Sequence, residues 1–277
     1  MVNVWEAMYD MKRALTIAGS DSSGGAGLQA DLRTFHAYGV YGMSAVTAVT
    51  VQNTLSVSNV FALPVDIVVE QIRAVLDDIG ADVIKIGMIP TGAMVQAVAK
   101  TLQQWPQIPI VVDPVLRASV GEELASSQAI EALRNELLPL AMVVTPNLDE
   151  AQQITGFPVR DRVDMRRAAR TLAHMGIRAV VVKGGHLEEH SAADLLWYDG
   201  RELWKEAPRV ATPHTHGTGC TFASAMAASI AQGASYADAM TEAKSFVWEA
   251  LKEAPGFGHG AGPLGQPWRR QRRDEDG

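Results

Sequence analysis

Cysteine is nearly absent from this sequence, because its 277 residues include only Cys220. A single cysteine excludes an internal disulfide framework. The chain also has no CxxC pair and no Cys/His spacing of the kind that holds structural zinc. We therefore expect a reducing compartment and place the protein in the cytoplasm.

Excess basic charge and long apolar runs are missing as well. The formal net charge of −7 at pH 7 counts against a nucleic-acid partner, because such proteins neutralise phosphates with a basic face. No apolar stretch reaches the roughly 20 residues of a membrane-spanning helix, so we expect no membrane partner. Residues 1–10 lack the basic leader of a secretory signal and are interpreted as an N-terminal extension. Residues 265–277, with the basic run RRQRR, are expected to form a disordered tail.

Two common nucleotide-binding motifs are absent or incomplete. The P-loop pattern G-x-x-x-x-G-K-[ST] does not occur, so an ATP-dependent enzyme of this sequence needs another phosphate cradle. Residues 25–30, GAGLQA, match a loose G-x-G-x-x-A fingerprint, which raises the alternative of a NAD-dependent oxidoreductase. That fold needs an acidic residue about 20 positions further on, and residues 42–54 contain none.

Short β-branched runs alternate with longer amphipathic segments along the chain. The strands that we expect cover residues 14–18, 45–51, 83–87, 108–113, 141–145 and 179–183. Nearly continuous apolar strands separated by helices predict an α/β fold, in which helices cover both faces of a mostly parallel sheet. Asp199-Gly200 between two apolar runs predicts a β-hairpin over residues 195–204. No repeat or linker interrupts the pattern, so we expect one domain over residues 11–264.

The expected strands end in polar and glycine-rich segments. In a parallel sheet, ligands collect at the carboxyl ends of the strands, so these segments are predicted to converge on one edge. They are residues 18–21, 52–53, 87–88, 113–114, 145–147 and 183–186. Ser20 and Asp21 in the first segment are suited to close approach by a small polar substrate.

The segment Gly217-Thr218-Gly219-Cys220 leads into a small-residue run that predicts a long helix. Backbone N–H groups at a helix N-terminus bind anions, and the helix dipole strengthens the attraction. Cys220 lies at this positive end, so we expect its pKa to be lowered toward a thiolate or proton acceptor near neutral pH. The alternative is an inert buried cysteine behind an ordinary glycine turn.

A second group of chemically useful residues follows three other strands. Asn147 and Glu150 lie one helical turn apart and can hold Mg²⁺ through waters, with Asp113 as a further oxygen source. The alternative is a capping box, in which Asn147 and Glu150 satisfy each other's backbone N–H groups. Lys183 ends a strand beside two glycines and suits a phosphate contact.

Seven segments together resemble the hydroxymethylpyrimidine/phosphomethylpyrimidine kinases of thiamine biosynthesis, which belong to the ribokinase-like superfamily. In order, they are AGSDSSGGAGLQADLRTF, AVTVQNT, KIGM, VDPV, TPNLDEA, VKGGH and THGTGCTFASA. The resemblance implies a three-layer single-domain fold and an ATP- and Mg²⁺-dependent homodimer. Its substrates would be 4-amino-5-hydroxymethyl-2-methylpyrimidine and the monophosphate of that compound.

The resemblance also implies a role for each matching residue. Gly217, Thr218 and Gly219 would form the anion hole, and Cys220 would act as the general base. The pyrimidine would contact Gly19, Asp31, Gln52, Met88 and Val115. The nucleotide would contact Asn147, Lys183, Gly185 and Lys244, while Glu150 and Asp113 would organise the metal. The Gln52 carboxamide can donate and accept at once, which suits the edge of an aminopyrimidine.

The sequence departs from the family pattern at two places, and two alternative functions remain. Ser119 and Val120 stand where relatives carry a Lys-Ser pair in the loop M-x-A-K-S-G, and GPLGQPW replaces the usual G-P-x-N-H. Pyridoxal kinase is the nearest alternative, because some of these enzymes share the GxGC arrangement. A noncatalytic nucleotide-binding regulator is an alternative of another class.

Overall fold

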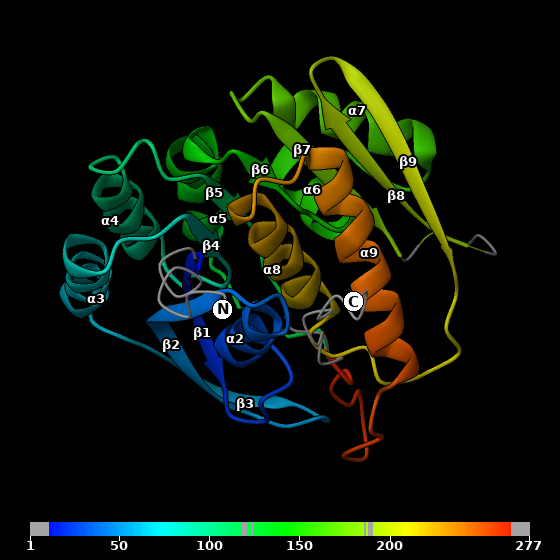
Figure 1. Ribbon diagram of the computed structural model, residues 1–277, viewed down its shortest axis with the longest axis horizontal. Coiled ribbons are helices and arrows are strands. Elements are labelled where there is room, and N and C mark those ends of the chain that lie inside the picture. Colours follow the sequence, from blue (N-terminus) through cyan, green and yellow to red (C-terminus); the bar gives the residue numbers. More distant parts are fainter. Residues whose placement is uncertain (1–10, 118–120, 123, 186, 188–190, 267–277) are drawn as a thin grey trace, which may run out of the picture.

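Parallel strands form the centre of a nine-stranded sheet (Figure 1). The computed structural model describes residues 11–117, 121–122, 124–185, 187 and 191–266. In spatial order the strands are β3, β2, β1, β4, β5, β6, β7, β8 and β9. Their bounds are β1 Arg13–Asp21, β2 Tyr41–Gln52, β3 Val57–Ala62, β4 Val83–Ile86, β5 Ile110–Val112, β6 Val143–Val144, β7 Ala179–Gly184, β8 Ser191–Tyr198 and β9 Arg201–Pro208.

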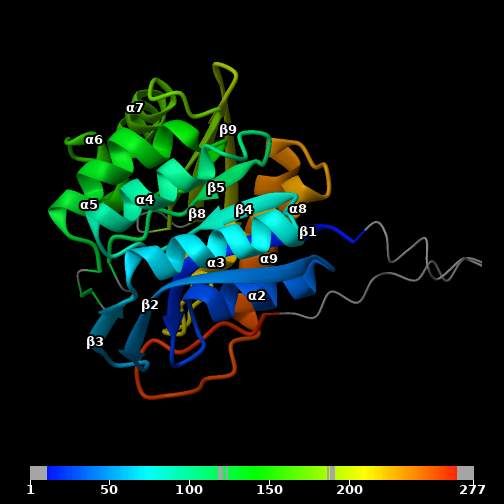
Figure 2. The ribbon, with the colours of Figure 1, turned by 90° about the vertical axis from the view of Figure 1, so that its left-hand side faces the viewer.

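Helices cover both faces of this sheet (Figure 2). One face carries α3 Val65–Asp78, α4 Gly92–Leu102, α5 Ser127–Ala132, α6 Leu148–Thr155 and α7 Arg162–Ala173, with the short turns η1 Leu133–Leu137 and η2 Leu138–Leu140. The other face carries α2 Gly27–Ala37, α8 Thr218–Ala231 and α9 Tyr236–Lys252, and α8 and α9 lie side by side (Figure 1). Among the described residues, no helix is long and apolar enough to cross a bilayer.

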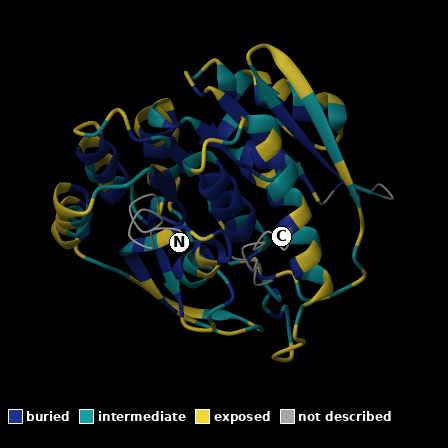
Figure 3. Ribbon diagram, in the orientation of Figure 1, coloured by how far each residue is buried: buried dark blue, intermediate teal, exposed yellow. Residues whose placement is uncertain are grey.

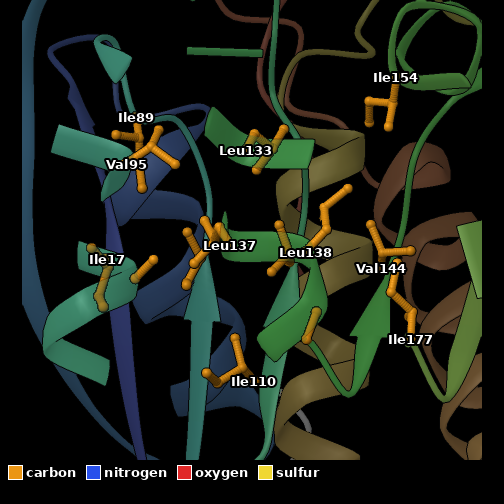
Figure 4. Packing of buried hydrophobic residues seen from close by; sticks show 14 of the residues in the cluster. Ile17, Ile89, Val95, Ile110, Leu133, Leu137, Leu138, Val144, Ile154 and Ile177 are labelled. Atoms are coloured by element: carbon orange, nitrogen blue, oxygen red, sulfur yellow. The ribbon is translucent and has the colours of Figure 1, made fainter. Parts of the chain in front are cut away.

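Successive side chains of the central strands point to opposite faces of the sheet, and both faces are buried. Val111 and Val143 pack with α2, α8 and α9, whereas Val112 and Val144 pack in the other layer. Figure 4 shows part of that second layer, and Figure 3 shows that the buried residues gather along the sheet. Because both faces are buried, the strands need apolar side chains at almost every position, which is why the sequence predicts them well.

The strands expected from the sequence all form, and the mostly parallel three-layer architecture is confirmed. One strand was missed. β3 pairs antiparallel with β2 at the edge of the sheet, and its side chains are exposed or half-buried. A strand without a buried face lacks the apolar pattern that reveals strands in a sequence.

The predicted hairpin is formed by β8 and β9, which extend beyond the expected residues 195–204. Asp199 and Gly200 form the two-residue connection, with φ angles of 48° and 74°. Two consecutive positive φ values give the turn a twist that matches that of the strands.

The folded part of the chain continues slightly past the predicted boundary at residue 264. The Gly265 N–H donates to the carbonyl of Ala250 over 3.0 Å. The Gln266 amide then donates to the hydroxyls of Thr34 and Thr221 over 3.2 and 3.1 Å. The proposed extension over residues 1–10, and the tail from residue 267 onward, lie outside the described residues.

Candidate active site

A cavity of about 620 Å³ is lined by the carboxyl ends of the parallel strands and by the start of α8. Every residue that the sequence assigned to the site lines this cavity, except Asp31. These lining residues are Gly19, Gln52, Met88, Asp113, Val115, Asn147, Glu150, Lys183, Gly185, Gly217, Thr218, Gly219, Cys220 and Lys244. The altered flap residues Ser119 and Val120 lie outside the described residues.

The glycine turn before α8 is shaped by close backbone approach. Gly217 caps the helix with a φ angle of 83°, in the region that favours glycine. A Cβ on Gly217 would lie 2.0 Å from the carbonyl oxygen of Gly25, so no larger residue fits without moving the first loop, residues 22–26 between β1 and α2. Gly219 and Cys220 belong to the first turn of α8, where backbone N–H groups have no acceptor inside the helix. These N–H groups are therefore a candidate anion site at the cavity wall.

The first loop is fixed to this turn by Asp21. Its carboxylate accepts backbone N–H bonds from Ser23, Gly25 and Ala26 over 2.8, 3.0 and 2.8 Å. His216, immediately before the glycine turn, places Nε2 2.8 Å from Asp21 Oδ2. The sequence placed Asp21 toward the substrate, whereas the structure turns this carboxylate back into its own loop.

Cys220 departs from its expected chemistry. The sequence predicted that the helix N-terminus lowers the pKa of the thiol, and the structure contradicts this. Burial raises the pKa of Cys220 to about 12, because only 9% of the residue is exposed. Lys85 opposes this rise, and the carboxylates of Asp31 and Asp113 add to it. In the free protein at neutral pH, Cys220 is therefore a thiol.

Lys183 and Asp113 form an ion pair beside the glycine turn. Lys183 Nζ donates to Asp113 Oδ1 over 2.9 Å. A Cβ on Gly219 would lie 3.1 Å from Lys183 Nζ and 3.5 Å from Asp113 Oδ2, so the pair borders the anion site. Burial alone would lower the pKa of Lys183, but attraction to Asp113 and Glu150 outweighs burial and raises it. The ammonium is thus a permanent positive charge at the cavity wall.

Asn147 and Glu150 form the capping box that the sequence offered as an alternative. Asn147 Oδ1 accepts the N–H of Glu150 over 2.9 Å, and Glu150 Oε2 accepts the N–H of Asn147 over 2.7 Å. Both residues nevertheless line the cavity. Burial raises the pKa of Glu150 to about 7; the Lys183 charge opposes this rise, and Asp113 adds to it. Capping and a cavity role are therefore compatible.

Asp31 is the predicted substrate residue that the structure places elsewhere. Its side chain is fully buried and accepts two hydrogen bonds of 2.9 Å from Lys85 Nζ. Thr16 and Ser224 also donate to it, over 2.6 and 2.7 Å. With its carboxylate enclosed by these donors, Asp31 supports the cavity from behind and does not face a substrate.

Another part of the cavity wall comes from α9 and the end of β9. Val247, Trp248 and Leu251 line it, and the Trp248 indole donates to the carbonyl of Pro208 over 3.0 Å. Lys244, predicted to contact the nucleotide, lies on this wall and donates to Asp194 over 2.7 Å. Its charge is thus already balanced by a carboxylate.

Sequence reasoning missed Lys85 and the wall formed by α9. Lys85 is the charged residue inside the apolar run VIKI, and a lysine between two isoleucines in a buried strand needs a partner. That signal was present but not used. The α9 residues gave no comparable signal, because apolar residues on a helix usually pack in a core.

Comparison with known proteins gives consistent results. The phosphomethylpyrimidine kinase family matches residues 21–265. A hydroxymethylpyrimidine/phosphomethylpyrimidine kinase of Streptomyces coelicolor is 47% identical over 254 residues, covering 92% of this chain and 94% of the relative. The solved ADP complex of a Bacillus subtilis pyridoxal kinase has a TM-score of 0.86 at 39% identity, covering 92% and 97% of the two chains. For a phosphomethylpyrimidine kinase from Clostridium difficile the TM-score is 0.78 at 38% identity, with 87% and 99% covered.

The sheet, the cavity at its carboxyl edge and the glycine turn define a small-molecule kinase of ribokinase-like fold. Within that class, the chain belongs to the phosphomethylpyrimidine kinase family. The resemblance found in the sequence is therefore confirmed, as is the expectation of a kinase.

The link between Asp21 and the glycine turn predicts a stability effect that depends on pH. Burial works to raise the pKa of Asp21, but the bonds from His216, Ser23 and Ala26 together lower it. A lowered folded-state pKa stabilises the protein above the unfolded pKa of about 4, and this stabilisation is lost as the pH falls through the folded value. We expect Asp21→Asn to lower the free energy of unfolding by about 2–4 kcal/mol at pH 7. Urea unfolding at pH 7 and near pH 3 measures the effect, which should shrink at the lower pH.

The matched control is Asp77→Asn, because Asp77 is exposed on α3. It should change stability by less than about 0.5 kcal/mol. Equal losses for the two variants would contradict a structural role for the Asp21 carboxylate.

Proposed function

We propose that the protein transfers the γ-phosphoryl group of ATP to the hydroxymethyl group of 4-amino-5-hydroxymethyl-2-methylpyrimidine. A second transfer then converts the monophosphate to the pyrophosphate. The observation that carries this proposal is the meeting of three parts in one cavity: the candidate anion site of α8, the Lys183–Asp113 pair, and the wall formed by the first loop with Gln52 and Met88. A cytoplasmic location fits a single reduced cysteine.

The pyrimidine would lie against Gly19, Gln52, Met88 and Val115. A Cβ on Gly19 would lie 3.0 Å from Met88 Sδ, so glycine lets the thioether lie against the first loop, where its polarizable sulfur can contact a flat ring. Gln52 Oε1 accepts from Thr50 over 3.1 Å, which orients the carboxamide. An amide held in this way can pair with a ring nitrogen and an exocyclic amine together.

ATP would occupy the part of the cavity lined by β7, β9 and α9. The apolar side chains of Val247, Trp248 and Leu251 suit a purine base, and Trp248 is held in place by its bond to Pro208. Gly185 and Lys244 would lie along the nucleotide, with Asn147 and Lys183 at its phosphates. The solved ADP complex of the Bacillus subtilis relative supports nucleotide binding in this fold.

The donors at the phosphate end fit a magnesium ion. Asp113 and Glu150 are buried carboxylates at the cavity wall, and Mg²⁺ is commonly held by one or two carboxylates together with waters and substrate phosphates. Within the described part of the chain, no group of three or more His, Cys, Asp or Glu residues forms a complete metal cage. Bound there, the ion would neutralise charge on the ATP phosphates.

In the first transfer, the hydroxymethyl oxygen forms a bond to the γ-phosphorus, the bond from that phosphorus to the bridging oxygen breaks, and ADP leaves. The N–H groups of Gly219 and Cys220 stabilise the negative charge of the transferring group. The hydroxyl proton passes to Cys220 acting as a thiolate. Because burial raises the thiol pKa to about 12, this thiolate is a minor species at neutral pH, and the first transfer should speed up as the pH rises.

The second transfer places a different demand on Cys220. Its nucleophile is a phosphate oxygen, and a phosphate monoester with a second pKa of about 6 has already lost that proton at neutral pH. We therefore expect Cys220→Ala to slow the first transfer by about 100-fold or more, and to change the second by less than about fivefold. Single-turnover assays with the alcohol and with its monophosphate measure the two steps separately. Equal losses in both steps would contradict a base role for Cys220.

Pyridoxal kinase activity is the second candidate, because the Bacillus subtilis pyridoxal kinase has the same fold at a TM-score of 0.86. ATP turnover with the pyrimidine alcohol, its monophosphate and pyridoxal in separate assays decides between them. We expect kcat/KM for the pyrimidine alcohol to exceed that for pyridoxal by about tenfold or more, a difference of about 1.4 kcal/mol. Preference for pyridoxal would overturn the assignment. ATP binding without transfer to any of the three would instead favour a noncatalytic regulator.

We also propose a homodimer formed through the exposed face of β2 and β3. Val49 pairs with Phe61 across these strands, and Val49, Val51 and Phe61 are 45%, 58% and 66% exposed. Such an apolar sheet face is suited to burial against a second copy. We expect light scattering to give twice the 29.7 kDa chain mass for the wild type and for the control Val163→Asp, which alters an exposed residue of α7. Phe61→Asp should be monomeric, and a dimer in that variant or a monomeric wild type would contradict the proposal.

A further inference from the structure

A buried lysine lies behind the thiol of Cys220. Lys85, on β4, is fully buried, and its ammonium bonds to both carboxylate oxygens of Asp31 over 2.9 Å. Lys85 also lines the cavity, whereas Asp31 does not. Among the described residues, Asp31 is the only acceptor of its hydrogen bonds, so one of three ammonium donors is left over.

The Asp31 carboxylate joins the two helices that begin at the cavity. Ser224 of α8 donates to Asp31 over 2.7 Å, and Ser224 follows Cys220 by one helical turn. Gly27 begins α2 one turn before Asp31, and its backbone N–H acts to lower the pKa of the Cys220 thiol. Thr16 of β1 completes the group with a bond of 2.6 Å. Lys85 and Asp31 therefore lie near Cys220, and the Asp31 carboxylate is held by donors from β1, β4 and α8.

Stability alone gives little reason for this ion pair. Two buried charges lose their hydration, and apolar residues of similar volume are often as stable in such positions. The space around the ammonium is also restricted, since a Cβ on Gly87 would lie 2.9 Å from Lys85 Nζ. A charge that is costly to bury, held at one position and bordering the reaction cavity, points to a role in the reaction.

We propose that Lys85 is a positioning residue for the first phosphoryl transfer: its ammonium, fixed by Asp31, supplies positive charge behind Cys220 and favours proton transfer to the sulfur. This inference rests on the proposed function, because it concerns the proton transfer to Cys220 in the proposed first phosphoryl transfer. The charged groups around the sulfur are Lys85 from β4, Asp31 from α2, Asp113 after β5 and Lys183 from β7. Lys183 is paired with Asp113, and Lys85 is the cation that acts most strongly on the sulfur.

The test removes both charges of the pair together. The double variant Asp31→Asn and Lys85→Met leaves no unpaired buried charge, and asparagine keeps an acceptor for Thr16 and Ser224. We expect kcat of the first transfer to fall by about 100-fold, with KM for ATP changed by less than about threefold. The second transfer, which needs no base, should change by less than about fivefold.

A second readout does not depend on turnover. Cys220 is the only cysteine in the chain, so alkylation by iodoacetamide reports on this sulfur alone. We expect the double variant to react about tenfold more slowly than the wild type at pH 8.5, because the Lys85 charge lowers the thiol pKa by more than the Asp31 carboxylate raises it, so that removing both reduces the thiolate fraction. Lys100→Met, which alters an exposed residue of α4, is the control and should leave both rates unchanged.

Each outcome decides the proposal. A folded double variant with wild-type rates of first transfer and alkylation would show that Lys85 serves only as the counterion of Asp31, and would overturn it. If the double variant does not fold, Gly87→Ala keeps both charges and displaces the ammonium; unchanged rates in that variant would equally overturn the proposal. A wild type that phosphorylates none of the substrates would refute the proposed function, while the alkylation comparison still tests the effect of Lys85 on the sulfur.

Discussion

The contact between the first turns of α2 and α8 sets the geometry of the cavity. Gly217 lies so close to Gly25 that a Cβ on Gly217 would collide with the Gly25 carbonyl, and Ser224 donates to the Asp31 carboxylate across the same contact. Both helices therefore present their N-terminal ends at the carboxyl edge of the sheet, where parallel topology collects ligands. The anion site follows from this packing, because the N–H groups of Gly219 and Cys220 belong to a helix whose start is held on two sides.

Charge is distributed around the cavity in a way that suits phosphoryl transfer. Loose transition states of this reaction depend mainly on positioning and on neutralisation of phosphate charge. The Lys183 ammonium borders the anion site and is paired with Asp113. This ion pair fixes the position of the ammonium and keeps it charged. Lys85 is placed behind the sulfur. Lys183 balances the carboxylates that would organise the metal, whereas the charge of Lys85 is paired with Asp31.

Most of the fold and of the cavity lining could be predicted from the sequence, because buried parallel strands have a recognisable apolar pattern. Buried strands require apolar runs, and their polar ends identify the edge at which Gln52, Asp113 and Lys183 line one cavity. The extent to which each side chain is buried could not be predicted from the sequence. Proximity to a helix N-terminus predicted a lowered pKa for Cys220, but desolvation outweighs that effect and raises it. Burial also determines the role of Asp31, whose carboxylate is enclosed by donors from three other elements. The strand β3 could not be predicted because it has no buried face.

In the proposed reaction, the start of α8 receives the transferring phosphoryl group while Cys220 faces the substrate alcohol. A crystal structure with a nonhydrolysable ATP analogue and the pyrimidine alcohol would show both groups in place. We expect the terminal phosphate on the N–H groups of Gly219 and Cys220, with the hydroxymethyl oxygen within hydrogen-bonding distance of the sulfur. A terminal phosphate bound away from α8, or a hydroxymethyl group turned away from Cys220, would contradict it.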